Sequence, residues 1–284
     1  MKSAMELWFT EKQLTEEEIS TVCLSVRIRD VLYREKTPLQ EIAVFDTYEF
    51  GRMLVLDGII QLTTADEFIY HEMIAHVPMR THPSPENILI VGGGDGGTVR
   101  EVSKYPGVQK ITLAEIDQKV IETSRKYLPE LGIAFDDPRV EIKIIDGVEY
   151  VRSLKNTFDV VIVDSPDPLG PAKDLFSADF YKDVFEALKP DGIMTIQCES
   201  PILNRKLTRR LYQSIKHAFP NFYYYLAPMP TYPSGLWSFA VGSKRYNPLQ
   251  PQNDFTPGHT RYYSPQIHLS AFTLPPFIQD IFTE

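Results

Sequence analysis

A glycine-rich segment between an apolar run and a helix-like stretch constrains this chain more than any other feature. Residues 92–97 hold five glycines and one acid, Asp95. They follow the strand-like run at residues 88–91, and a helix-like stretch begins at Gly97. Glycines at such a joint let the backbone turn sharply and lie close to a ligand. The pattern predicts a nucleotide-type loop at the end of a strand, although it does not say which nucleotide binds.

Strand-like and helix-like segments alternate from residue 87 onward. The expected strands lie at residues 88–91, 111–116, 140–145, 158–163 and 193–197. The expected helices lie between them, at residues 97–105, 119–127, 177–188 and 205–219. This alternation predicts an α/β fold with a doubly wound, Rossmann-like parallel sheet. Residues 158–163 are too apolar to be half exposed, so we expect them in the middle of the sheet. Two more strands, at residues 221–227 and 237–242, would add an antiparallel edge.

The first part of the chain has a different character. Short strand-like runs, separated by turn signals, lie at residues 21–33, 41–48, 53–56 and 59–63. They predict a small antiparallel sheet. A helix-like stretch follows at residues 66–76. We therefore expect two domains, an N-terminal β-sheet domain at residues 1–64 and a Rossmann-like catalytic domain at residues 65–284.

Composition excludes several classes of function. The formal net charge is −9, which argues against a nucleic-acid-binding face and suits a cationic ligand better. The two cysteines, Cys23 and Cys198, are far apart and not at metal-ligand spacing, which favours a reducing compartment. No apolar run approaches the roughly 20 residues of a membrane span, and the N-terminus has no signal-like segment. We expect a cytoplasmic protein that binds neither nucleic acid nor a membrane.

Acids and a glycine mark the ends of the second and third expected strands. Glu115 lies roughly 20 residues past the glycines, where an acid binds ribose hydroxyls in Rossmann-like folds. Asp146 and Gly147 follow the third strand, where they could meet an adenine. Each acid alone could equally be a solvated loop residue, but together they predict an adenosine pocket. Asp95 would repel a pyrophosphate, so a sulfonium nucleoside such as S-adenosylmethionine or a relative fits better than NAD.

A proline-rich stretch at residues 164–171 follows the mid-sheet strand. Asp164 and Asp167 lie three residues apart on it, at the same expected edge of the sheet as the adenosine pocket. Aspartates before prolines can simply cap turns. The functional alternative is a pair of anions that hold an amine and accept its proton.

Five segments together resemble the polyamine aminopropyltransferases, the spermidine synthase type in particular. They are residues 56–58, 66–73, 92–97, 164–171 and 230–235, in the order in which that family has them. The resemblance implies a methyltransferase-type Rossmann-like fold and transfer of the aminopropyl group of decarboxylated S-adenosylmethionine to a diamine, usually putrescine. The products would be spermidine and methylthioadenosine. It also implies a homodimer or homotetramer. Because the sulfonium supplies its own leaving group, we expect no metal and no cofactor, with the donor as a co-substrate.

The resemblance also implies roles for single residues. Asp164 would accept the proton of the attacking amine. The other residues that bind the amine substrate would be Tyr70, His71, Asp167 and Tyr232. The donor-binding residues would be Gln40, Gln61, Asp95, Glu115, Asp146, Gly147 and Pro171. Among these, Asp95 would hold the ammonium of the aminopropyl arm and Glu115 the ribose.

Two positions depart from the family pattern. Pro166 stands where Ser or Thr is usual, and Thr64-Ala65 stand where an acid–base pair is usual. Both leave the fine substrate preference open. Two alternative functions also stay open: an S-adenosylmethionine-dependent N-methyltransferase that acts on putrescine, and a catalytically silent polyamine-binding relative.

Overall fold

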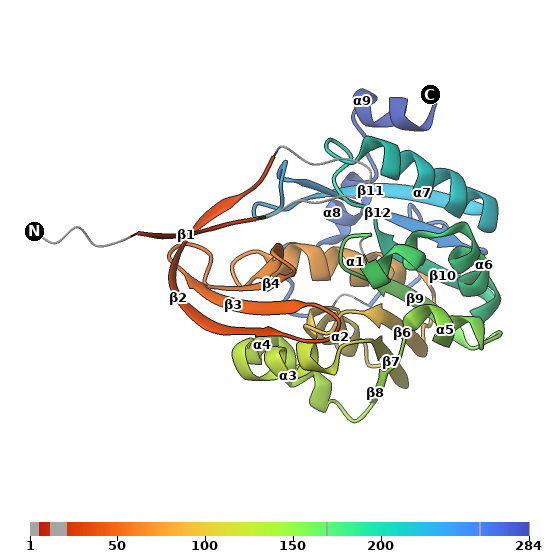
Figure 1. The fold of residues 1–284 in the computed structure, drawn as a ribbon. Helices are drawn as coiled ribbons and strands as arrows, with labels where there is room; N and C mark the ends of the chain where they lie inside the picture. Colours follow the sequence, from red (N-terminus) through yellow and green to blue (C-terminus); the bar gives the residue numbers. More distant parts are fainter. Residues whose placement is uncertain (1–5, 12–21, 169, 256, 284) are drawn as a thin grey trace, which may run out of the picture.

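Two β-sheets organise the computed structural model of this chain, which describes residues 6–11, 22–168, 170–255 and 257–283 (Figure 1). The smaller sheet belongs to the N-terminal part and extends away from a larger α/β body. This arrangement confirms the predicted fold class, a Rossmann-like α/β sheet with a small N-terminal antiparallel sheet.

The N-terminal sheet is antiparallel, and its five strands lie side by side in chain order. The strands are β1 (Leu7–Thr10), β2 (Ser25–Lys36), β3 (Glu41–Thr47), β4 (Arg52–Leu56) and β5 (Ile59–Thr63). Asp57 and Gly58 form the turn between β4 and β5, with φ angles of 50° and 88°. A two-residue hairpin turn of this kind favours Asp-Gly, so the sequence predicts it well. The sequence does not predict β1.

The large sheet has seven strands in the order β11-β12-β10-β9-β6-β7-β8. The five central and edge strands from β10 to β8 are parallel, whereas β12 and β11 are antiparallel to their neighbours. The strands are β6 (Asn87–Gly92), β7 (Lys110–Glu115), β8 (Val140–Ile144), β9 (Phe158–Asp164), β10 (Leu188–Gln197), β11 (Asn221–Pro228) and β12 (Leu236–Ser243). β9 occupies the middle of the sheet, as its sequence predicts.

Helices cover both faces of the large sheet. The helices are α1 (Glu67–Thr81), α2 (Gly97–Ser103), α3 (Gln118–Tyr127), α4 (Pro129–Gly132), α5 (Gly147–Arg152), α6 (Ala178–Ala187), α7 (Arg205–Ala218), α8 (Pro265–Ala271) and α9 (Pro276–Gln279). Three 3-10 segments are η1 (Ile133–Asp136), η2 (Gly170–Phe176) and η3 (Asp280–Phe282). Within β9, Val160 and Ile162 pack into the core beneath α1 and α2, whereas Val161 and Val163 pack into the core beneath α6 and α7. Burial on both faces explains why β9 is apolar throughout rather than alternating.

The sequence prediction misses the full length of α1 and the short helix α4. α1 continues beyond the expected end at residue 76 and passes through Pro78 to Thr81. Ile74, Val77 and Met79 are fully buried, so tertiary packing outweighs the local cost of the proline. Pro129 does follow the end of α3, but it also begins the short helix α4, because proline is tolerated at the first helical position. α5, α8 and α9 are too short for a helical period to reveal them.

The N-terminal sheet packs against α3 and α4. Ile42, Val44 and Leu54 share one buried cluster with Val120 and Leu131. This contact places the β2–β3 loop and β5 near the carboxyl ends of β6 and β7. The predicted domain boundary between residues 64 and 65 falls between β5 and α1, and we keep it as a proposal. No helix among the described residues is long and apolar enough to cross a membrane.

Candidate active site

One cavity lies where the carboxyl ends of β6, β7 and β9 meet the N-terminal sheet. Apart from Pro171, every residue that the sequence predicts for the site lines this cavity: Gln40, Gln61, Tyr70, His71, Asp95, Glu115, Asp146, Gly147, Asp164, Asp167 and Tyr232. Pro171 lies in η2, but its side chain falls outside the described part. The structure thus brings the predicted residues together, and their individual roles stay predictions.

Glu115 ends β7 and is almost completely buried. Its Oε1 accepts a hydrogen bond of 2.9 Å from the backbone N–H of Asp117. Burial raises the pKa of Glu115 to about 7, and backbone N–H donors, including that of Asp117, oppose the rise. A Cβ at Gly94 would lie 2.7 Å from Glu115 Oε2. A side chain at this position would displace the Glu115 carboxyl group, so glycine lets the loop lie against it.

Gln40 reaches this half of the cavity from the N-terminal sheet. Its Nε2 donates to Asp117 Oδ2 over 3.1 Å, and the Thr37 hydroxyl donates to the same oxygen over 3.1 Å. Asp117 also caps α3, because its other oxygen accepts from the N–H of Lys119. These bonds connect the β2–β3 loop to the start of α3, beside Glu115.

Asp146 and Gln61 line the cavity but already have internal partners. Asp146 is the N-cap of α5, and its Oδ1 accepts from the N–H of Val148 over 2.7 Å. Gln61 Nε2 donates to the carbonyl of Ile59 over 3.3 Å. At least one polar atom of each side chain therefore holds local structure.

Asp164 ends β9, and both of its oxygens are hydrogen-bonded. The Tyr70 hydroxyl donates to Oδ1 over 2.9 Å, and the Thr98 hydroxyl donates to Oδ2 over 2.6 Å. Burial and the nearby Asp95 raise the pKa of Asp164 to about 6, although His71 and the two hydroxyls pull it down. At neutral pH this group is therefore a carboxylate that can accept a proton.

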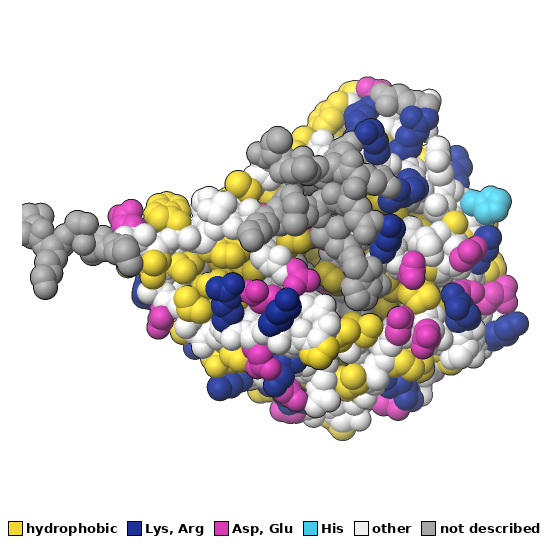
Figure 2. Space-filling view, in the orientation of Figure 1, with side chains coloured by type: hydrophobic (Ala, Val, Ile, Leu, Met, Phe, Trp, Pro, Cys, Tyr) yellow, Lys and Arg dark blue, Asp and Glu magenta, His cyan; other side chains and the backbone are white. Residues whose placement is uncertain are grey.

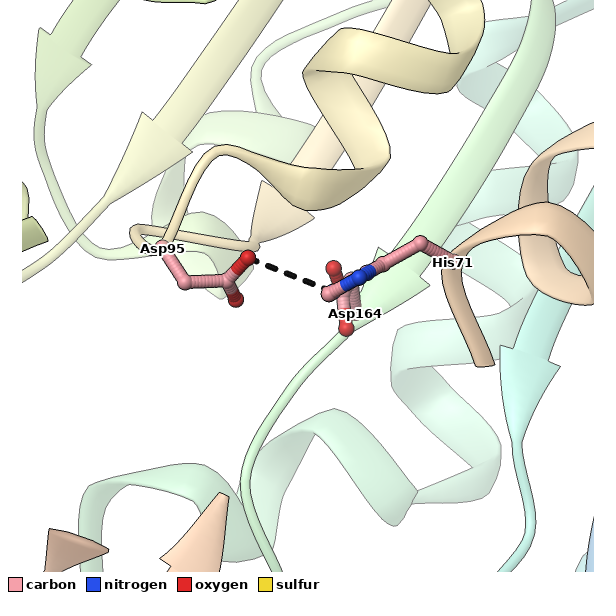
Figure 3. A group of neighbouring side chains, drawn as sticks. All are labelled: His71, Asp95 and Asp164. Atoms are coloured by element: carbon pink, nitrogen blue, oxygen red, sulfur yellow. Dashed lines mark ion pairs between the residues drawn. The ribbon is translucent and has the colours of Figure 1, made fainter. Parts of the chain in front are cut away.

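His71 lies between the carboxylates of Glu67 and Asp95, and Figure 3 shows its pairing with Asp95. Its Nδ1 is 2.6 Å from Glu67 Oε2, and its Nε2 is 3.2 Å from Asp95 Oδ1. α1 carries His71, and the glycine-rich loop carries Asp95, with Asp164 at the end of the neighbouring strand. A Cβ at Gly97 would lie 2.2 Å from the His71 ring, so glycine lets α2 begin directly against the imidazole.

The two carboxylates keep the His71 imidazole protonated. Burial alone would lower the pKa of His71, but Asp95 and Glu67 outweigh it and hold that pKa well above its usual range. Burial likewise favours a higher pKa for Asp95, but His71 prevails and lowers it. Arg100 donates two hydrogen bonds of 2.9 Å to Glu67 and so holds this carboxylate in place beside His71. Both ring nitrogens of His71 face carboxylates in this state, and its predicted role in binding the amine substrate stays a prediction.

The three side chains drawn in Figure 3 are also close enough together to be considered as a cation site. His71, Asp95 and Asp164 offer nitrogen and oxygen atoms that all lie within 4.8 Å of one another. We do not assign them as metal ligands, because these atoms are already paired with each other, with Tyr70 and with Thr98. A group of two carboxylates and one imidazolium suits an alkylammonium equally well. The absence of a metal from the reaction stays a prediction.

A second, smaller cavity adjoins the first beyond Tyr70 and Tyr232. It shares Gln61, Tyr70, Asp167 and Tyr232 with the first cavity and adds Glu11, Gln197 and Trp237. The Tyr232 ring lies 4.5 Å from the Trp237 ring, centre to centre, in an edge-to-face arrangement. Two aromatic walls with acids beyond them form a channel that suits a chain of methylene groups ending in a cation.

The carboxyl groups of Glu11 and Asp167 line the far end of this channel, and the buried Glu199 lies next to them without lining it. Burial and the neighbouring Asp167 raise the pKa of Glu199 well above its usual range, and Glu199 and Asp167 are hydrogen-bonded to each other. Burial also raises the pKa of Glu11 to about 7, with Asp167 adding to the rise. Glu11 Oε1 accepts a hydrogen bond of 2.9 Å from the N–H of Ile60. Burial and mutual repulsion thus favour the protonated forms of Glu199 and Glu11 at this end of the channel.

Three residues of this site are not predicted from the sequence: Glu11, Thr98 and Glu199. Glu199 lies two residues past the end of β10, at the same sheet edge as Glu115 and Asp164. The rule that identified those two acids would have found it. Glu11 has no such signal, because only the docking of the N-terminal sheet brings it to the channel.

Two family models match this chain. The spermine/spermidine synthase domain matches residues 67–253, and the spermidine synthase tetramerisation domain matches residues 7–64. The two matched ranges include the strands of both sheets and the residues that line the cavity.

Curated relatives match along almost the whole chain. The polyamine aminopropyltransferase of Moorella thermoacetica is 54% identical over 275 residues, which cover 96% of this chain and 95% of the relative. The polyamine aminopropyltransferase of Bacillus cytotoxicus is 48% identical over 278 residues, which cover 98% of this chain and 99% of the relative.

Solved structures of spermidine synthases have the same fold. One, in complex with the transition-state analogue AdoDATO, has a TM-score of 0.92 and 42% identity, and the match covers 98% of this chain and 95% of the other. The spermidine synthase of Thermotoga maritima has a TM-score of 0.89 and 41% identity, covering 98% and 94%. The chain therefore belongs to the spermine/spermidine synthase family. It is an enzyme, a polyamine aminopropyltransferase, which confirms the resemblance found in the sequence.

Proposed function

We propose that this enzyme transfers the aminopropyl group of decarboxylated S-adenosylmethionine to putrescine, giving spermidine and methylthioadenosine. The position of Asp164 carries the proposal. Its carboxylate lies where the nucleotide-type half of the cavity meets the aromatic channel with acids at its end. The related spermidine synthase with bound AdoDATO, a transition-state analogue, supports this reading.

The donor occupies the half of the cavity beside the glycine-rich loop. Glu115 accepts hydrogen bonds from the ribose hydroxyls, and Asp146 and Gly147 face the adenine. Gln40, Gln61 and Pro171 flank the nucleoside. Asp95 binds the ammonium of the aminopropyl arm, which then shares this carboxylate with His71. This sharing places the carbon next to the sulfonium near Asp164.

The diamine occupies the channel between Tyr70 and Tyr232. Its remote ammonium lies among Asp167, Glu199 and Glu11, while its other nitrogen faces Asp164. A free alkylamine has a pKa near 10.4, so it must lose a proton before or during attack. Its lone pair forms the new C–N bond, the C–S bond breaks, and the bonding electrons neutralise the sulfonium to a thioether. The proton passes to Asp164.

Product analysis tests this proposal directly. The purified chain is incubated with putrescine and either decarboxylated or intact S-adenosylmethionine, and products are identified by mass spectrometry. Spermidine and methylthioadenosine from the decarboxylated donor alone are the expected result. N-Methylputrescine from the intact donor would establish the methyltransferase alternative, and no product from either donor would contradict the proposed transfer and is the result expected of a silent polyamine-binding relative. Unchanged turnover after dialysis against a chelator is expected, because the donor carries its own leaving group.

We also propose that the chain assembles as a homotetramer through its N-terminal sheet. The tetramerisation-domain match at residues 7–64 supports this. Leu7, Trp8 and Val31 of β1 and β2 are exposed, and hydrophobic side chains are visible on this projecting part of the surface (Figure 2). Light scattering coupled to size-exclusion chromatography measures the assembled mass, and a monomer at micromolar concentration would contradict the proposal.

A further inference from the structure

Thr98 contacts the proposed proton acceptor from the side away from the substrates. It is the second residue of α2, directly after the glycine-rich loop, and its side chain is fully buried. Its hydroxyl donates a hydrogen bond of 2.6 Å to Asp164 Oδ2. Tyr70, which donates to the other oxygen, lines the cavity, whereas Thr98 does not. Thr98 therefore acts on the carboxylate without touching either substrate.

The bond from Thr98 stabilises the ionised form of Asp164. A threonine hydroxyl has a single hydrogen to donate, and in this structure Asp164 receives it. A donor that points at a carboxylate favours the charged state over the protonated one. Because Thr98 is completely buried, water cannot replace its hydroxyl on that side.

Several charged or titratable groups face Asp164 from the surrounding elements. They are Tyr70 and His71 from α1, Asp95 from the glycine-rich loop, and Tyr232 from the segment between β11 and β12. Burial and Asp95 destabilise the carboxylate, while His71, Thr98 and Tyr70 stabilise it. His71 and Tyr70 line the cavity, so bound substrates change their surroundings. Of the three stabilising groups, Thr98 alone lies outside the lining of the cavity, so a substrate in the cavity does not contact it.

We propose that Thr98 is a positioning residue for the aminopropyl transfer, which fixes the orientation of the Asp164 carboxylate and keeps it ionised for proton acceptance. This inference rests on the proposed role of Asp164. A carboxylate has about four lone-pair sites. Thr98 and Tyr70 each occupy one site, on different oxygens, which leaves one site on each oxygen for the amine proton.

The first test compares pH profiles of kcat/KM for wild type, Thr98→Val and Thr98→Ser. Valine keeps the shape of threonine and lacks the hydroxyl, whereas serine keeps the hydroxyl and lacks the methyl group. For the wild type we expect activity to fall as the pH drops through about 6, because Asp164, whose pKa burial and Asp95 raise to about 6, then takes up a proton. In Thr98→Val this limb moves up by about one pKa unit, the size expected for one hydrogen bond to a charged group. The loss is then roughly fivefold at the wild-type midpoint and small at higher pH. Thr98→Ser keeps the wild-type profile.

Two outcomes would overturn the proposal. A Thr98→Val profile with the wild-type midpoint would show that the hydroxyl does not act on Asp164. An equal shift in Thr98→Ser would show that the packing of the methyl group is responsible. Thr98→Ala also lacks the hydroxyl and adds no branched side chain, so it must shift the profile in the same direction if the valine variant does not fold.

A second measurement separates this proposal from the proposed function. The carboxyl carbon of Asp164 is followed by NMR in protein labelled with 13C-aspartate, and its signal is assigned by its absence in Asp164→Asn. The pKa read in this way must be higher in Thr98→Val than in wild type, and it needs no turnover. If the wild type makes no spermidine, the proposed function fails and the titration still decides the role of Thr98. If spermidine forms but the pKa does not move, only the Thr98 proposal fails.

Discussion

Replacing Asp95 with asparagine should change which donor the enzyme prefers. The decarboxylated donor ends in an ammonium alone, whereas the intact donor carries a carboxylate on the same carbon. The Asp95 carboxylate attracts the first group and repels the anionic part of the second. Asparagine keeps the side-chain oxygen that accepts from the N–H of Gly97, so the loop retains its turn while the charge is lost. We therefore expect a large loss of affinity for the decarboxylated donor and little change for the intact one.

The size of this effect follows from the charges around Asp95. Two unit charges about 4 Å apart interact by about 4 kcal/mol at an effective dielectric constant near 20. Asp95 is already paired with the protonated His71 over 3.2 Å, and an arriving ammonium must share the carboxylate with it. If sharing leaves the ammonium about half of this interaction energy, about 2 kcal/mol, its loss in Asp95→Asn lowers the preference for the decarboxylated donor. The ratio of the two dissociation constants then changes by roughly 30-fold.

Equilibrium binding is the assay, because it does not depend on turnover. Dissociation constants of both donors are measured by calorimetry for wild type, Asp95→Asn and Glu115→Gln. Glu115 faces the ribose, which both donors carry, so Glu115→Gln should weaken both by the same factor and serves as the matched control. If Asp95→Asn also weakens both donors equally, Asp95 only holds the loop and this account of donor choice is refuted.

Three further predictions concern the amine side of the cavity. Asp164→Asn should lower turnover by roughly 10²- to 10⁴-fold with unchanged donor affinity in calorimetry; near-normal turnover would disprove its role as proton acceptor. Asp167→Asn should raise KM for putrescine by about tenfold or more, and Glu199→Gln should raise it less, because Asp167 lines the channel and Glu199 does not; equal effects in initial-rate measurements would contradict this. Putrescine binding should release protons near pH 7, because a bound ammonium lowers the raised pKa values of Glu199 and Glu11; binding heats that do not depend on the ionisation enthalpy of the buffer would rule this out.

The sequence predicts the parallel sheet and the donor half of the site because both depend on local patterns. Apolar runs, glycines and turn residues define β6 to β9, and the parallel topology then places Asp95, Glu115 and Asp164 at one edge. The length of α1 could not be read from the sequence in this way, because packing rather than helix propensity carries it past Pro78. The predicted location in the cytoplasm and the absence of a nucleic-acid partner stay predictions.

The acceptor half of the site depends on contacts between distant segments, and sequence patterns do not report these. Glu11 bonds to the backbone of Ile60, 49 residues later, because β1 pairs with β2 at the edge of the N-terminal sheet. Thr98 reaches Asp164, 66 residues later, because α2 lies against the end of β9. Neither residue type is unusual where it stands, so only the folded chain reveals what it contacts.

The two ends of the cavity balance their negative charge in different ways. At the donor end the balancing cation belongs to the protein, because Glu67 and Asp95 keep His71 protonated. At the acceptor end the described lining of the smaller cavity includes acids and no basic side chain, and protons on Glu199 and Glu11 supply the balance. An arriving donor must therefore share a carboxylate with a fixed cation, whereas an arriving diamine displaces protons that can leave. We therefore expect acceptor binding to respond more strongly to pH than donor binding, with Asp164, between the two ends, as the carboxylate that we propose accepts the proton of the attacking amine.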